Sequence, residues 1–369
     1  MKSKDTDDVS KRLADILFPE SKIKEFEMLD IPPEQRKLHT ETYDFSVSTI
    51  FEYLTTDKIV IPTFQRNYVW NRAQASRLIE SLIIQCPIPV LYFSQTEDER
   101  FSVIDGNQRL TTIKLFLNND FELSNLTTYP ELNGSTFASL DPRFQRHINN
   151  RTLRCIVILK ETHPQIKFDV FERLNTGSVK LNAQELRHGI YHGSLVDLIE
   201  ELSKEKLFQE LTQTKNDTRM KCDELILRYF ALASDWNDYS NPFVTFLNSY
   251  AERNRNLNNS SISELKLSFL NTYNKIYQLF GDLSYKVFED EGKKIRFNAA
   301  LYDAEMIAIK VLDLSDNQIK KIDRARLNVG LIKLFNDEDF YKYITAATTN
   351  TNSVKNRIKK FIEFLRQFI

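Results

Sequence analysis

The sequence predicts an α+β domain followed by an all-α helical domain. Nine of the ten prolines fall at or before Pro164, and only Pro242 lies in the rest of the chain. Short apolar runs bounded by turn residues, typical of strands, occur in the first half, whereas apolar residues recur with a helical period from Ser194 onward. A chain of 369 residues with 41% hydrophobic side chains suffices for two domains. The expected divisions are a charged N-terminal arm (1–42), an α+β domain (43–192) and a helical domain (193–369).

In the α+β domain, apolar residues three and four positions apart predict helices over 47–54 and 73–85. A further helix, in the run NQRLTTIKLFL, directly follows a strand that ends at Ile104. A helix over 168–174 and the segment LNAQELRHGIYHG complete this domain. The expected strands and extended runs are 59–64, 89–94, 101–104 and 152–159, with a polar stretch at 118–150 before the last.

In the helical domain, the Asn-rich run NRNLNNSS is the clearest loop between helices. The last helix has an apolar stripe flanked by basic residues. Packing of that stripe on the bundle is favoured over contact of the helix with nucleic acid. The expected helices are 194–210, 221–235, 242–254, 261–280, 297–313, 318–336 and 353–368; the stripe of the last is Val354, Ile358, Phe361, Ile362, Leu365 and Ile369, and its basic residues include Lys355, Arg357 and Lys359.

The residue counts exclude several classes of protein. Fifty Lys and Arg against fifty-one Asp and Glu give a net charge of −1, so no bulk field attracts the chain to nucleic acid or an anionic membrane. Neither common nucleotide-binding glycine motif occurs among the eight glycines. The three cysteines lie far apart in apolar surroundings, which predicts buried thiols rather than disulfides or a zinc site. No apolar run approaches ~18 residues, so we expect a cytoplasmic protein without a membrane span.

The segment FSVIDGNQRLTTIKLFL is the most informative in the chain. A strand that ends at Asp105 and turns into a helix presents the backbone N–H groups of Gly106, Asn107 and Gln108 at the helix N-terminus, a ready anion site. Arg109 would add a bidentate cation for phosphate oxygens. The hydroxyls of Thr111 and Thr112 are further candidate ligands. In the structural alternative, Asp105 only caps the helix, Gly106 relieves a tight turn and Arg109 is solvated.

A second cluster of polar and aromatic side chains occurs in IPTFQRNYVW. Gln65 and Arg66 stand beside Tyr68 and Trp70 on an expected loop, where aromatic faces and a guanidinium suit a base or a phosphate. The alternative is a structural loop anchored by buried aromatic side chains.

A third cluster, FERLNTGSVKLNAQELRHG, contains candidate metal ligands. Glu172 and Asn175 would be neighbours near the end of a helix, and such oxygens suit a Mg²⁺ that completes its shell with water and nucleotide phosphates. The alternative is that the Asn-Thr-Gly run is a helix C-cap and that Glu185 and Arg187 are surface charges.

Together these motifs resemble a known family. The blocks IPTFQRNYVW, RLIESLIIQCPIPVLYF, FSVIDGNQRLTTIKLFL and VFERLNTGSVKLNAQELRHG, in this order, are similar to domains of unknown function that carry a D-G-Q-Q-R motif. That family includes the N-terminal part of GmrSD-type restriction proteins and is similar to ParB and sulfiredoxin. The segments KIRFNAALYDAEMIAIKVL and TNTNSVKNRIKKF also resemble the helical half of family members. This sequence has Asn107 where the family commonly has Gln.

The resemblance implies a ParB/sulfiredoxin-like fold and a Mg²⁺-dependent nucleoside triphosphate hydrolase in prokaryotic restriction or anti-phage defence. The D-G-x-Q-R positions implied as catalytic are Asp105, Gln108 and Arg109. Gly106 and the Gln65–Arg66 pair would bind the nucleotide, and Glu172 with Asn175 would hold the metal, although their spacing differs from the ParB pattern. The base, in GTP, ATP or CTP, stays open.

Two alternative functions use the same residues. In the first, the chain is a DNA-binding or DNA-nicking module. In the second, it is a non-catalytic subunit that only senses nucleotide. Many relatives add a His-Asn-His nuclease, but residues 193–369 contain no histidine, so that nuclease does not lie within them. A separate nuclease or another defence subunit is therefore an expected partner, together with nucleotide and DNA.

Overall fold

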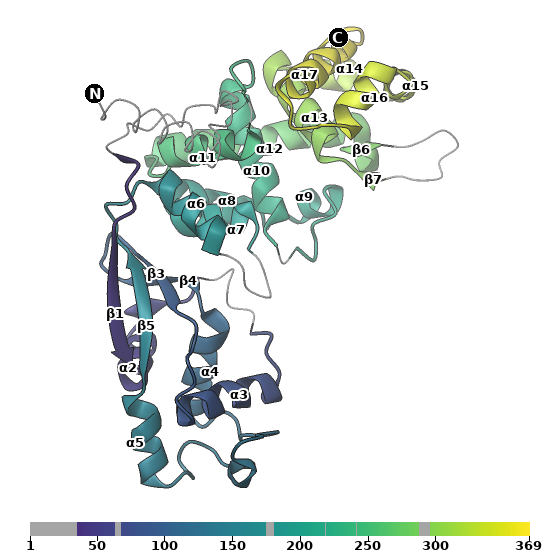
Figure 1. Ribbon diagram of the computed structural model, residues 1–369. Coiled ribbons are helices and arrows are strands. Elements are labelled where there is room, and N and C mark those ends of the chain that lie inside the picture. The colour runs from purple at the N-terminus through teal and green to yellow at the C-terminus, as the bar shows by residue number, and fades with distance from the viewer. Residues whose placement is uncertain (1–34, 63–67, 175–180, 218, 241, 288–295) are drawn as a thin grey trace, which may run out of the picture. The chain divides into compact units, whose positions relative to one another are not determined.

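The computed structural model describes residues 35–62, 68–174, 181–217, 219–240, 242–287 and 296–369. Most of the predicted arm, residues 1–34, lies outside these ranges, and Leu38–Ile369 forms one compact unit. Strands and helices alternate in the first half (Figure 1). Its elements are β1 (Thr40–Ser46), α2 (Val47–Thr55), β2 (Ile59–Val60), α3 (Arg72–Ile83), β3 (Leu91–Gln95), β4 (Phe101–Asp105), α4 (Asn107–Leu117), a 3-10 helix (Pro130–Leu132), α5 (Pro142–Asn150), β5 (Thr152–Ile158), α6 (Pro164–Leu174) and α7 (Ala183–Ile190).

The second half is helical apart from one short hairpin, which confirms the predicted fold class. Its elements are α8 (Ser194–Leu202), α9 (Lys206–Leu211), α10 (Lys221–Asp235), α11 (Phe243–Arg253), α12 (Asn259–Phe280), a 3-10 helix (Gly281–Leu283), β6 (Lys286–Val287), β7 (Arg296–Phe297), α13 (Ala299–Leu312), α14 (Asp316–Lys321), α15 (Arg324–Phe335), α16 (Glu338–Thr345) and α17 (Thr351–Arg366). In the part of the chain that the structure describes, no helix has both the length and the apolar composition needed to cross a bilayer.

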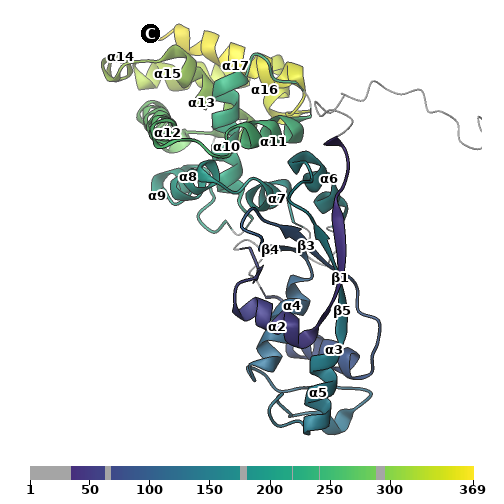
Figure 2. The same cartoon turned by 90° about the vertical axis from the view of Figure 1, so that its left-hand side faces the viewer.

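The five-stranded sheet has the order β1-β5-β3-β4-β2. β1 pairs antiparallel with β5, β3 pairs parallel with β5 and antiparallel with β4, and β2 pairs parallel with β4. Inward side chains of this sheet pack against α2, α3, α4 and α5 in one hydrophobic core. Ile104 and Ile158, at the ends of β4 and β5, instead join the core of the helical half through α6 and α7, which lie beside that end of the sheet (Figures 1 and 2). The β4 end therefore lies where the two cores meet.

Helix α13 is the centre of the helical half, because its residues 300–309 are all buried. Burial on every side explains why its sequence is apolar without a clear stripe. The Asp303 carboxylate within it accepts hydrogen bonds from Arg228 at 3.0 and 2.5 Å and from Arg357 at 2.5 Å. This buried ion-pair triad joins α10, α13 and α17.

The predicted docking of the last helix on the bundle is confirmed. Its stripe residues from Val354 to Leu365 are buried, whereas Ile369 is half exposed. Arg357 was expected on the basic outer surface, and this is wrong, because the side chain is fully buried on Asp303. A buried countercharge compensates for the lost hydration of the guanidinium.

Several elements differ from their predicted positions. β1, α5, α16 and the β6–β7 hairpin were not expected. The predicted helix 194–210 is two helices, because side chains of Gln209 and Cys222 bond to the Ser203 carbonyl where α8 ends. The predicted helix 318–336 is also two, because the Asp323 side chain accepts from the Ala325 and Arg326 amides and starts α15.

Two of the three cysteines are buried as predicted, and burial raises the pKa of both the Cys155 and Cys222 thiols to about 12. The prediction is wrong for Cys86, which is exposed. It lies in the turn after α3, directly before Pro87, where the chain leaves the core.

Candidate functional site

The junction of β4 and α4 is built around Gly106. This residue is the N-cap of α4 with φ 107° and ψ 8°, and the Leu110 amide donates to its carbonyl at 2.9 Å in the first helical bond. A Cβ at this position would lie closer than 3.0 Å to Cδ2 of Leu91, so both backbone angle and space require glycine. Asp105 was considered as the helix cap, but the cap is Gly106 and makes no side-chain bond. The first turn of α4, with its N-terminal amides, therefore directly follows the end of β4.

Arg109 holds this turn against the segment before β3. Its Nη2 lies 2.7 Å from Asp105 Oδ2, and its Nη1 donates to the carbonyls of Pro89 and, at 3.3 Å, Val90. The guanidinium side chain is 12% exposed and the Asp105 side chain 33%. Burial lowers the pKa of Arg109, and the Asp105 carboxylate opposes that shift. The solvated Arg109 of the structural alternative is thus excluded, and Asp105 is the more accessible of the two charges.

Gln108 and Thr112 lie one turn apart on α4 and contact the segment that precedes α3. Gln108 Oε1 accepts from the backbone amides of Val69 at 2.9 Å and Trp70 at 3.3 Å. Thr112 Oγ1 donates to the Gln108 carbonyl at 2.7 Å and lies 2.8 Å from the Tyr68 hydroxyl. Thr112 is fully buried. The predicted catalytic Gln108 and the predicted ligand Thr112 are therefore part of one internal hydrogen-bond network.

The two remaining α4 candidates interact with each other, since Thr111 Oγ1 donates to Asn107 Oδ1 at 3.0 Å. Both are partly exposed, so this pair borders the first turn without being enclosed. Gln65 and Arg66 lie outside the described residues. They follow β2 in the chain, and the parallel pairing of β2 with β4 puts the carboxyl ends of both strands at one edge of the sheet.

The predicted metal ligands are only half described. Glu172 is exposed on α6, and Asn175 lies outside the described residues. Among the residues that the structure describes, no group of three or more His, Cys, Asp and Glu side chains could hold a metal ion. Asp105 is the described carboxylate at the β4–α4 junction, and a single protein carboxylate suffices for a Mg²⁺ that takes the rest of its shell from phosphates and water.

The LNAQELR segment serves the fold. Glu185 and Arg187 were expected as surface charges under the structural alternative, and this is wrong because both are buried. Glu185 Oε1 lies 2.9 Å from Arg219 Nε, and Arg187 donates to Asn248 at 2.7 Å. Burial lowers the pKa of Arg187 to about 10. Sequence reasoning could not find Asn248 as a partner, because it lies 61 residues away in the chain.

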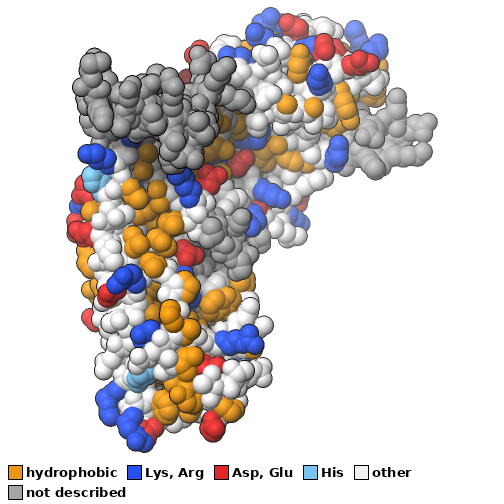
Figure 3. Space-filling view, viewed as in Figure 1, with side chains coloured by type: hydrophobic (Ala, Val, Ile, Leu, Met, Phe, Trp, Pro, Cys, Tyr) orange, Lys and Arg blue, Asp and Glu red, His pale blue; other side chains and the backbone are white. Residues whose placement is uncertain are grey.

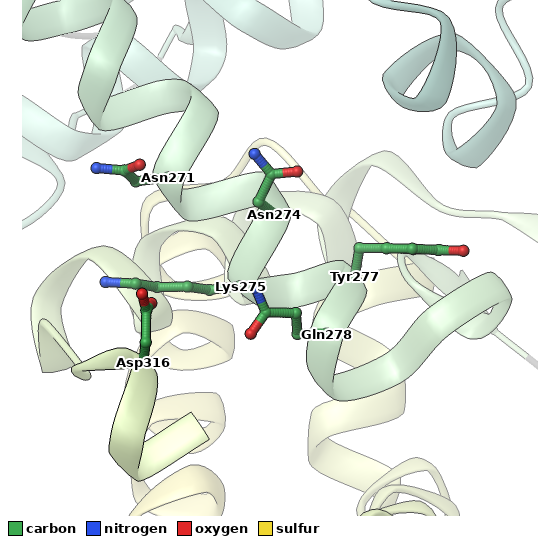
Figure 4. Close-up of a pocket in the computed structure, with 6 residues that line it drawn as sticks. All are labelled: Asn271, Asn274, Lys275, Tyr277, Gln278 and Asp316. Atoms are coloured by element: carbon green, nitrogen blue, oxygen red, sulfur yellow. The ribbon is translucent and has the colours of Figure 1, made fainter. Parts of the chain in front are cut away.

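Two surface pockets lie away from the β4–α4 junction. The larger, of about 540 Å³, is lined by α12 side chains and Asp316 of α14 (Figure 4). Its lining is polar and mostly exposed, without a buried charge or a catalytic pair. The other, of about 410 Å³, lies around residues 209–221. Neither contains a predicted site residue, so the geometry of the β4–α4 turn remains the better candidate.

Comparison with known proteins agrees with the motif resemblance. Residues 47–192 match the sequence profile of the "GmrSD restriction endonuclease, N-terminal domain" family. A solved Pnob8-like ParB-N domain is similar at 12% identity over 89% of this chain and 98% of that chain, with a TM-score of 0.21. No curated protein sequence matches the chain.

Proposed function

Because residues 47–192 are a domain of the GmrSD restriction endonuclease N-terminal family, we propose that the chain binds a nucleoside triphosphate with Mg²⁺ in a restriction or anti-phage defence system. The observation that carries the proposal is the Asp105–Gly106–Arg109 turn. Here Gly106, in the left-handed backbone region, caps the N-terminus of α4 beside the partly exposed Asp105 carboxylate and the largely buried Arg109 guanidinium. Anions bind at such helix starts because the amides and the helix dipole are oriented toward them.

Each group has a separate task in this proposal. The first-turn amides of α4 bind phosphate oxygens, and Arg109 supplies fixed positive charge at the base of the turn. Because the Arg109 guanidinium already donates to the carbonyls of Pro89 and Val90, it supplies a positive charge at a fixed position rather than two parallel hydrogen bonds to one phosphate. Asp105 orients water or the metal. Mg²⁺, when bound, neutralises charge on the phosphates.

Slow hydrolysis is the expected outcome of this binding, with the partly exposed Asp105 carboxylate as the side chain that orients the attacking water. A nucleotide sensor without turnover would bind equally well. The two are separated by phosphate release measured with Mg²⁺ and by its loss in Asp105→Asn.

The test is titration of ATP, GTP and CTP with Mg²⁺ against the wild type, Arg109→Ala and Arg100→Ala. Arg100 is the matched control, because it also pairs with an aspartate at 2.5 Å but lies in the exposed β3–β4 turn. We expect Arg109→Ala to weaken binding at least about tenfold, equivalent to 1.4 kcal/mol, and Arg100→Ala to leave it unchanged. No binding by the wild type, or equal binding by Arg109→Ala with an unchanged melting temperature, would refute the proposal.

DNA binding is the second candidate function, favoured by the restriction endonuclease named in the family description. Figure 3 shows Lys and Arg intermixed with Asp and Glu on the face that it presents, rather than one broad basic surface. With a net charge of −1, non-specific binding should be weak and salt-sensitive. Gel shifts at low salt on plain and modified DNA test this, and free DNA in every lane would exclude it.

A further inference from the structure

We propose that the Gln108 side-chain oxygen and the Thr112 hydroxyl are positioning groups that hold Tyr68–Trp70 against the start of α4, the first rather than orienting an attacking water and the second rather than binding a phosphate. This inference rests on the proposed nucleotide site. It changes the role of Gln108 from a catalytic group to the acceptor of a backbone clamp. We call the bonds of Gln108 and Thr112 to residues 68–70 the α4 clamp.

The Gln108 side-chain carbonyl is the first half of the clamp. One oxygen accepts from two successive amides, Val69 N at 2.9 Å and Trp70 N at 3.3 Å. Because a carbonyl oxygen has two lone pairs, these two bonds use its full acceptor capacity. The oxygen is thus committed to the protein backbone and is not available to orient an attacking water.

The Thr112 hydroxyl is the second half. Its single hydrogen goes to the Gln108 carbonyl at 2.7 Å, so in the 2.8 Å contact with Tyr68 the tyrosine hydroxyl is the donor. Thr112 is fully buried and therefore out of reach of a phosphate. Burial raises the pKa of Tyr68, which keeps its phenol protonated as this bond requires.

The clamp connects the N-termini of two helices. Directly after Trp70, Asn71 caps α3, accepting from the Gln74 amide at 2.9 Å in a capping box. Fixing residues 68–70 to α4 therefore fixes where α3 begins relative to the phosphate turn. If the nucleotide uses this edge of the sheet, loss of the clamp displaces one wall of its site while Gly106 and Arg109 stay in place.

The two tryptophans of the chain make the clamp directly observable. Trp236→Phe leaves Trp70 as the single tryptophan, and its acrylamide quenching reports on the clamped segment without nucleotide. In this background we would compare Gln108→Leu, Tyr68→Phe and Thr112→Val with Thr112→Ser, which retains the hydroxyl. Thr212→Val is the matched control, because its buried hydroxyl also donates at 2.7 Å to the carbonyl four residues earlier, that of Phe208, but makes no bond to residues 68–70.

We expect Gln108→Leu and Tyr68→Phe each to increase quenching and to weaken nucleotide affinity about three- to tenfold, the effect of one or two lost hydrogen bonds. The double variant should lose less than the product of the two, since both act through one segment. Thr112→Ser should resemble wild type and Thr112→Val the clamp variants, whereas Thr212→Val should change neither readout.

Two results would overturn the positioning role. If Gln108→Leu weakens nucleotide binding while the quenching of Trp70 stays as in the wild type, Gln108 acts on the nucleotide directly. Increased quenching with unchanged affinity would show that the clamp does not serve the site. Absence of nucleotide binding by the wild type would refute the proposed function instead, and the quenching data would still decide whether the clamp exists.

Discussion

Replacement of Gly106 by alanine should destabilise the protein through two separable effects. At φ +107° an alanine is strained by about 1–3 kcal/mol. Its Cβ would also lie closer than 3.0 Å to Leu91 Cδ2, and Leu91 is fully buried and restricted by the sheet core. Overpacking of this kind costs about 1–3 kcal/mol more.

Gly134 provides the matched control, because it also has a positive φ, +82°, but a Cβ there would meet nothing within 4 Å. Gly134→Ala should therefore show the backbone term alone. Both substitutions change the unfolded-chain entropy equally, so the difference between them contains the overpacking term and any difference in backbone strain between φ +107° and φ +82°.

Urea unfolding of both variants measures this difference as a shift in midpoint at constant slope. Gly106→Ala should lose about 1–3 kcal/mol more than Gly134→Ala. In a Leu91→Val background, which removes the clashing atom, most of that excess should disappear. Equal losses at the two glycines, or an excess that persists in the Leu91→Val background, would refute the reasoning.

Two further predictions concern the helical half. Arg357→Met should lower the free energy of unfolding by about 3 kcal/mol, because it leaves the buried Asp303 carboxylate with Arg228 alone. The control Lys359→Met, at an exposed position, should change the free energy of unfolding by less than about 0.5 kcal/mol in the same chemical unfolding experiment. Equal losses in the two variants would contradict a stabilising role of the triad. Burial raises the pKa of Asp223 from 3.8 to about 6, so the folded state favours the protonated form of this carboxyl group. The stability of the wild type should therefore fall as the pH rises from about 4 to about 6 and then level off. Asp223→Asn should remove this slope and stabilise the protein at pH 7 by about 1–3 kcal/mol in pH-resolved melting, and an unchanged slope would exclude Asp223 as its source.

Local sequence patterns predicted much of the fold and of the candidate site. The β4–α4 junction was predictable because a strand-like run, an Asp-Gly pair and a helical period follow one another within a few residues. The stripe of α17 was likewise visible, since its spacing alone identifies a buried face. Glycine at position 106 was expected to relieve a turn, and the positive φ bears this out.

Long-range partners were not predictable. β1 was not predicted, because most of it is exposed and its strand conformation comes from pairing with β5 more than a hundred residues later, as in the Asp44–Arg154 pair at 3.1 Å. The carbonyls of Pro89 and Val90, which receive Arg109, carry no signal in the side-chain sequence. Tyr68 belonged to a recognised motif, but only its contact with Thr112 identifies its role.

The sequence by itself determined the division into an α+β half and a helical half, the match of residues 47–192 to a known family and the position of the β4–α4 junction. These depend on periodicity, composition and short motifs, which are properties of neighbouring residues. Only the tertiary structure decided which charged and polar side chains are accessible. Four polar side chains could be solvent-exposed as far as the sequence shows, but in the structure each is largely buried against a partner that is distant in the chain or on the adjacent turn: Arg109, Thr112, Arg187 and Arg357. The physical reason is that a buried polar group is stable only where folding supplies a hydrogen-bond or charge partner.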